Sequence, residues 1–106
     1  MGHVMARYTV RPDQVETNAA LVRDVYAELQ RVQPSGFRYA TFLLDDGLTF
    51  VHLASTSTSK DVDPLPKVAA FEAFQRDIAE RCEVPPVVQR AEEVGSYRPI
   101  RDERNA

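Results

Sequence analysis

Apolar residues occupy both sides of two neighbouring segments of the chain, residues 36–44 and 47–54, which are joined by an Asp-Asp-Gly turn. Side chains of a β-strand alternate between the two faces of a sheet, so a strand with one wet face alternates apolar with polar residues. Here the alternation is missing, since Phe50 and Val51 fall on opposite faces. The pattern predicts a β-hairpin that is covered on both faces.

Two longer segments carry apolar residues at helical spacing. Between Val15 and Val32 they recur every three or four positions, which predicts an amphipathic helix. Asp13 and Glu16 have the spacing of a capping box, so we expect their side chains to cap its first turn. A second helix is predicted over residues 67–83. Its apolar stripe consists of Val68, Phe71, Phe74, Ile78 and Cys82.

Segments 4–10 and 87–97 read as the first and last strands, which gives the order βαββαβ. Right-handed crossovers place both helices on one face of a four-stranded antiparallel sheet. The sequence therefore predicts an α+β, ferredoxin-like fold in a single domain, residues 3–98, followed by a charged tail, residues 99–106.

The predicted sheet has one face without helices. Four strands of about seven residues give that face a footprint of roughly 400 Å². Monomeric proteins seldom expose apolar patches above ~300–600 Å². We therefore expect a second copy of the chain to cover this face, sheet against sheet, in a homodimer.

Composition narrows the function classes. The net charge of −3 favours neither nucleic acid nor an anionic membrane surface as a partner. No apolar run approaches the ~20 residues that cross a bilayer, and a single cysteine fits a reducing, cytoplasmic setting. Two histidines and one cysteine without close spacing predict no metal site, and no cofactor-binding motif is present.

RNA-recognition domains share the βαββαβ order, and segment 46–53 matches their third-strand motif at Gly47, Phe50 and Val51. Asp46 stands where that motif has a basic residue, and Leu48 replaces a stacking ring. The sequence thus disfavours RNA binding.

Segment 6–12, Ala-Arg-Tyr-Thr-Val-Arg-Pro, runs into the first helix, and the last strand ends in Gly-Ser-Tyr-Arg at 95–98. With the order and length of the elements, these features make residues 3–98 resemble the dimeric α/β-barrel superfamily, within it the small antibiotic-biosynthesis-monooxygenase-like proteins. The resemblance implies two sheets forming a dimeric α/β barrel; some members oxidise polycyclic aromatic substrates without metal or flavin. The chain departs from active members because it has no tryptophan and no histidine in residues 67–83.

His52 is the candidate catalytic residue, because it shares an apolar strand face with Leu48 and Phe50. An imidazole there can act as a base toward a phenolic proton near neutral pH. The alternative is a histidine that is hydrogen-bonded within a dimer interface and has no catalytic role.

The candidate ligand-binding residues are Tyr39, Thr41, Phe50 and Arg7. Tyr39 and Thr41 share one strand face and could orient a substrate, while Arg7 could bind an anion or pair with Glu92 or Glu93. Cys82 fits a buried apolar position better than a nucleophile. We expect a small apolar or aromatic ligand between sheet and helices, with residues 55–63 as a lid. The protein is then a cofactor-independent monooxygenase or a non-catalytic ligand-sensing or protein-interaction module.

Overall fold

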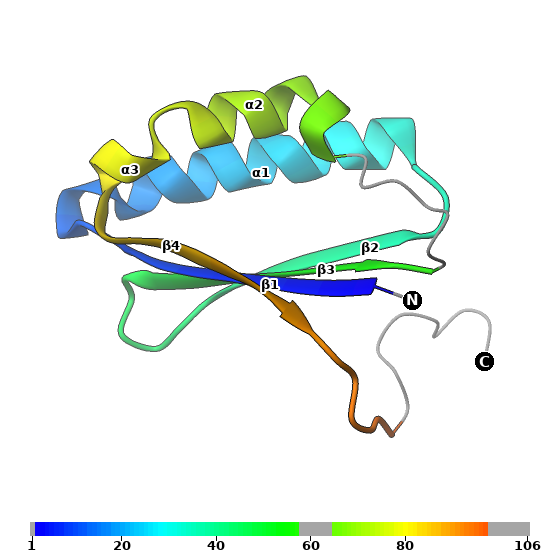
Figure 1. The fold of residues 1–106 in the computed structure, drawn as a ribbon. Helices are drawn as coiled ribbons and strands as arrows, with labels where there is room; N and C mark the ends of the chain where they lie inside the picture. The colour runs from blue at the N-terminus through cyan, green and yellow to red at the C-terminus, as the bar shows by residue number, and fades with distance from the viewer. Residues whose placement is uncertain (1, 58–64, 98–106) are drawn as a thin grey trace.

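The computed structural model describes residues 2–57 and 65–97. One antiparallel sheet has the strand order β2-β3-β1-β4. Its strands are β1 (Gly2–Val10), β2 (Phe37–Leu43), β3 (Thr49–Thr56) and β4 (Cys82–Ala91). The helices are α1 (Val15–Val32), α2 (Ala69–Arg76) and α3 (Ile78–Arg81), with short 3-10 turns at Pro12–Gln14 and Leu65–Lys67. All three helices lie on one side of the sheet (Figure 1), which confirms the predicted α+β, ferredoxin-like fold.

The hairpin turn forms as its residues predict. Gly47 has a φ of 73°, a left-handed conformation that glycine adopts without strain. The Asp46 carboxylate accepts hydrogen bonds from the backbone N–H groups of Leu48 and Thr49 and from the Thr49 hydroxyl. These bonds to its charged form lower the pKa of Asp46.

Two boundary predictions are wrong. The predicted helix 67–83 is two helices separated at Asp77, and the last strand is β4 (Cys82–Ala91) rather than residues 87–97. Pro85 and Pro86, which were expected to precede the strand, lie inside it. Because β4 is an edge strand, paired with β1 among the described strands, prolines are tolerated there, and the register shifts between the Arg7–Val87 and Thr9–Val84 pairs.

The predicted capping box is also wrong, since no side chain of the described part of the chain caps the start of α1. Pro12 instead opens a 3-10 turn that leads into the helix. A carboxylate does reach a helix start elsewhere: Glu28 Oε1, on α1, accepts a hydrogen bond from Ala70 N–H in the first turn of α2 at 3.0 Å. This contact joins the two main helices.

The hydrophobic core lies between the sheet and the helices. Alternation along β1 directs Tyr8 and Val10 toward the helices, and alternation along β3 directs Phe50 the same way. The buried core residues are Tyr8, Val10, Val22, Val25, Phe50, Leu65, Phe74 and Cys82. Cys82 is therefore a buried residue, as its position on the stripe predicts.

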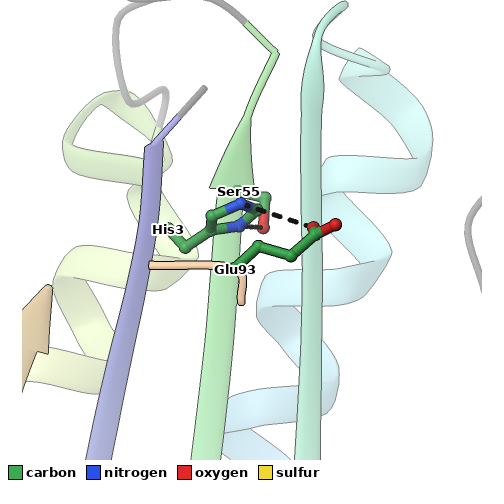
Figure 2. Close-up of polar contacts among 3 residues, drawn as sticks. All are labelled: His3, Ser55 and Glu93. Atoms are coloured by element: carbon green, nitrogen blue, oxygen red, sulfur yellow. Dashed lines mark hydrogen bonds and ion pairs between the residues drawn. The ribbon is translucent and has the colours of Figure 1, made fainter. Parts of the chain in front are cut away.

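None of the residues that the structure describes forms a helix on the opposite face of the sheet (Figure 1). Its exposed large apolar side chains include Met5 and Leu53 at 38%, Phe42 at 48% and Val87 at 56%. Figure 2 shows His3 on this side, with helices behind the strands. His3 Nδ1 lies 2.7 Å from Ser55 Oγ, and His3 Nε2 lies 3.8 Å from Glu93 Oε1.

Two predictions concern residues beyond the described ones. Of the predicted lid, Ser55 and Thr56 belong to β3, and residues 58–63 lie outside the described residues; the tail 99–106 does as well. None of the helices described has the length and apolarity that a membrane crossing requires.

Candidate functional site: a buried polar network ending at a tyrosine hollow

His52 lies at the centre of a polar network between the sheet and the helices. Its position on β3, two residues after Phe50, turns it toward the helices, and it is only 5% exposed. Its Nε2 lies 2.8 Å from the Tyr8 hydroxyl oxygen. Its Nδ1 lies 2.6 Å from the Tyr39 hydroxyl oxygen and 3.2 Å from Thr41 Oγ1. Both ring nitrogens therefore have hydrogen-bond partners from neighbouring strands.

The network continues from Tyr8 to a buried arginine. Asn18 Nδ2 donates to the Tyr8 hydroxyl at 2.9 Å, and Arg81 Nε donates to Asn18 Oδ1 at 3.0 Å. Arg81 Nη2 also donates to the Phe74 carbonyl at 2.6 Å, and its guanidinium lies over the Phe74 ring, 5.4 Å from the centroid. Arg81 is 5% exposed, and no carboxylate within the described residues pairs with it.

On the other side of His52 the network reaches α1 again. The Tyr26 hydroxyl lies 2.8 Å from Thr41 Oγ1. The Tyr26 ring stacks on the Tyr39 ring with centroids 5.3 Å apart, and Tyr39 stacks in turn on Phe37 at 5.9 Å. Three aromatic rings thus form a continuous wall beside the network.

Burial keeps the network neutral around His52. Desolvation lowers the pKa of His52 from 6.5 to about 4, because the rings of Tyr8, Tyr39 and Phe74 surround the imidazole and exclude water. The same desolvation raises the pKa of Tyr8 well above its ordinary value and raises that of Tyr26. At neutral pH the His52 imidazole and the phenols of Tyr8 and Tyr26 are uncharged.

A hollow of about 760 Å³ opens where α1 ends and β2 begins. Pockets of ~300–1,000 Å³ suit small ligands. We call it the tyrosine hollow. It is lined by Tyr26, Leu29, Gln30, Gln33, Pro34, Ser35, Gly36, Phe37, Arg38, Tyr39 and Ser57. Tyr39 belongs to both features, since it lines the hollow and its hydroxyl contacts His52.

The lining of the tyrosine hollow contains a strained residue. Gln33 ends α1 in the left-handed conformation, with φ 52° and ψ 59°, and its N–H donates to the Leu29 carbonyl at 2.7 Å. Among the described residues it alone has a positive φ without being glycine. Such conformations cost of order 1 kcal/mol and concentrate at functional sites.

Of the residues predicted from the sequence, the structure brings together His52, Tyr39 and Thr41, with Phe50 close by in the core. Arg7 lies on the opposite, helix-free face, paired across strands with Val51 and Val87. It is not part of this site. The alternative that Arg7 pairs with Glu92 or Glu93 is wrong: among the ion pairs of the described residues none involves Arg7, and Glu93 lies beside His3.

Within residues 2–57 and 65–97 no three His, Cys, Asp or Glu side chains converge as metal ligands would.

The alternative for His52, a hydrogen-bonded position within a dimer interface, is wrong about the location: the imidazole is hydrogen-bonded inside a single subunit.

Sequence reasoning missed Tyr8, Asn18 and Arg81. Asn18 lies at helical spacing between Val15 and Val22, and Arg81 follows Ile78 by three residues. A polar residue on an otherwise apolar helix stripe is the signal that could have identified both.

No protein-family profile matches the sequence, and no curated protein does either. Solved structures do resemble it. A candidate antibiotic biosynthesis monooxygenase from Nitrosomonas europaea superposes with a TM-score of 0.73 at 17% identity, covering 90% of this chain and 100% of its own. Rv0793 from Mycobacterium tuberculosis gives 0.64 at 20% identity, covering 90% and 96%. A conserved protein from Methanosarcina mazei Go1 gives 0.70 at 13% identity, covering 87% and 91%. At these identities the likeness establishes the fold, and this chain has the antibiotic-biosynthesis-monooxygenase-like fold.

Proposed function

We propose that the protein binds a small planar aromatic molecule in the tyrosine hollow. The observation that carries this proposal is the double role of Tyr39, which joins the aromatic wall of the hollow to the buried network around His52. A stacked wall offers a flat ligand a parallel surface, and Gln30 and Gln33, which carry amide groups, belong to the same lining. A ligand with an aromatic ring and oxygen substituents suits both.

Binding is tested with a hydroxynaphthoquinone probe, followed by isothermal calorimetry and by NMR shifts of the hollow residues. We expect Tyr39→Ala to weaken binding about tenfold, because a stacked aromatic pair contributes ~0.5–1.5 kcal/mol beyond its buried area. Tyr97→Ala is the matched control, since Tyr97 is 83% exposed beyond the end of β4. Equal affinities in the two variants would place the ligand elsewhere.

Cofactor-independent oxygenation of a phenolic substrate is the second candidate function. It is favoured by the fold shared with the candidate monooxygenase of Nitrosomonas europaea. Oxygen uptake with a polyketide-like phenol, compared between the wild type and His52→Ala, tests it. Uptake that is lost in the variant while binding persists supports an enzyme. Binding without oxygen uptake by the wild type supports a ligand-sensing module.

We further propose that the helix-free face joins two copies of the chain. The exposed apolar side chains on this face come from all four strands, among them Met5, Phe42, Leu53 and Val87. A patch of this kind favours a self-complementary contact over solvent, and two-fold dimers are the commonest closed assembly. The expected dimer is a barrel of two sheets.

Light scattering tests the assembly. We expect a mass of twice 12.0 kDa for the wild type and a shift toward 12.0 kDa for Leu53→Asp. Val32→Asp is the control, because Val32 is 52% exposed but lies on α1, across the sheet from the apolar face. A monomeric wild type at high protein concentration would contradict the proposal.

A further inference from the structure

The buried network has a direction that starts at Arg81. A guanidinium can only donate hydrogen bonds, so Asn18 must turn its carbonyl oxygen Oδ1 toward Arg81 Nε, 3.0 Å away. This fixes the other half of the amide. Asn18 Nδ2 faces the Tyr8 hydroxyl at 2.9 Å and donates to it. The orientation of Asn18 is therefore set by Arg81.

The same reasoning extends through Tyr8. Its hydroxyl oxygen accepts from Asn18, and the remaining neighbour of the hydroxyl is His52 Nε2 at 2.8 Å. If Nε2 carried a proton, the Tyr8 hydrogen would have no acceptor among the described residues, in a side chain that is 2% exposed. Leaving a buried donor unsatisfied is costly. The Tyr8 hydroxyl therefore donates to Nε2.

We propose that Arg81 and Asn18 are positioning residues that hold neutral His52 as the Nδ1–H tautomer. The Nδ1–H then donates to the Tyr39 oxygen at 2.6 Å, with Thr41 Oγ1 as a second acceptor at 3.2 Å. In this state the imidazole lone pair faces Tyr8, away from the tyrosine hollow. His52 accordingly serves the hollow as a hydrogen-bond donor that polarises Tyr39, rather than as a base acting from Nδ1.

The inference gains its functional meaning from the proposed function, since it describes what stands behind the wall of the ligand site. Its physical content is independent of any ligand. The tautomer is a property of the unliganded protein, so it holds or fails whether or not an aromatic probe binds.

The test is two-bond ¹H–¹⁵N correlation NMR of the imidazole nitrogens, which distinguishes the two neutral tautomers and the imidazolium. In the wild-type protein at neutral pH we expect Nδ1 to be protonated and Nε2 unprotonated, with at least about a tenfold preference. His52 is assigned by comparison with His3→Gln, because the chain has two histidines. A wild-type His52 protonated on Nε2 overturns the proposal without need of any variant.

Asn18→Asp tests the direction of the network. A carboxylate at this position accepts from both Arg81 and the Tyr8 hydroxyl, so the Tyr8 hydrogen turns toward residue 18 and its oxygen faces His52 as an acceptor. We expect the His52 proton to move from Nδ1 to Nε2. Thr41→Val is the matched control, since it removes a hydroxyl next to His52 without touching Arg81, Asn18 or Tyr8. We expect its tautomer to be that of the wild type.

A folded Asn18→Asp protein with an unchanged tautomer would show that Arg81 and Asn18 do not set the direction. A tautomer change in Thr41→Val would show that the Thr41 end of the network sets the tautomer, and it would also contradict the proposal. Both proposals are supported if Tyr39→Ala weakens ligand binding and the wild type, Asn18→Asp and Thr41→Val have the expected His52 tautomers. The expected tautomers without binding of the aromatic probe by the wild-type protein refute the proposed function alone.

Discussion

The burial of a neutral imidazole predicts that this protein loses stability in mild acid. In the unfolded chain His52 has its ordinary pKa of 6.5, and in the folded protein burial lowers the pKa to about 4. Between these two values the unfolded chain binds a proton that the folded protein does not. The stability is complete above the unfolded pKa and falls as the pH drops through 6.5 toward the folded pKa.

The magnitude follows from the two pKa values. Each pH unit between them costs about 1.36 kcal/mol, so lowering the pH from about 7.5 to about 5 removes about 2 kcal/mol from the free energy of unfolding. Extending the titration to the folded pKa raises the total to about 3 kcal/mol. The window above about pH 5 is the informative one, because most carboxylates titrate below it.

The measurement is urea unfolding at a series of pH values, at one fixed protein concentration so that self-association does not enter the comparison. His52→Gln removes the titrating group, and we expect it to lose the slope whatever its absolute stability. His3→Gln is the matched control, because the other histidine does not touch the buried network, and we expect the slope to remain. A wild-type stability that stays flat from about pH 7.5 to about 5, or a slope that survives in His52→Gln, would refute the reasoning.

Three further outcomes are expected. Tyr8→Phe should lower the free energy of unfolding by about 1–3 kcal/mol in chemical denaturation, because it leaves a buried donor and the Nε2 of His52 without their shared hydroxyl. Gln33→Gly should raise the free energy of unfolding, measured by thermal denaturation, by about 1 kcal/mol, because glycine adopts the left-handed conformation without strain. Gln30→Gly, within α1, should lower the free energy of unfolding by a similar amount. Cys82 should react with a thiol reagent only at the rate of unfolding, since its side chain is 5% exposed and burial raises its pKa; rapid labelling of the folded protein would contradict its burial.

The fold could be predicted from the sequence because its main signals are local. The two apolar segments of the hairpin, the stripe of α1 and the Asp-Asp-Gly turn each depend on neighbouring residues, and the structure contains the hairpin, the helix and the turn that they predict. The end of the second helix could not be placed in the same way. In the local sequence Pro85 and Pro86 predict the end of a helix or a strand. The edge position of β4 in the sheet explains why a strand runs through them.

The candidate site was predictable in part for a related reason. Strand alternation groups His52 with Phe50, and Tyr39 with Thr41, and these groups did meet on the helix-covered face. Alternation within one strand does not state which group faces the helices. The placement of Arg7 on the opposite face therefore required the cross-strand register.

Asn18 and Arg81 show what the hydrophobic pattern conceals. Each occupies a position on a helix stripe that an apolar residue could fill without needing a hydrogen-bond partner. Both are buried: Asn18 is 0% exposed and Arg81 is 5% exposed. Burying them is costly unless every polar atom finds a partner. Their bonds to each other, to Tyr8 and to the Phe74 carbonyl meet that requirement. A core that only needed stability could fill these positions with leucine, so the network is better explained by what it fixes: the direction of each hydrogen bond that reaches His52.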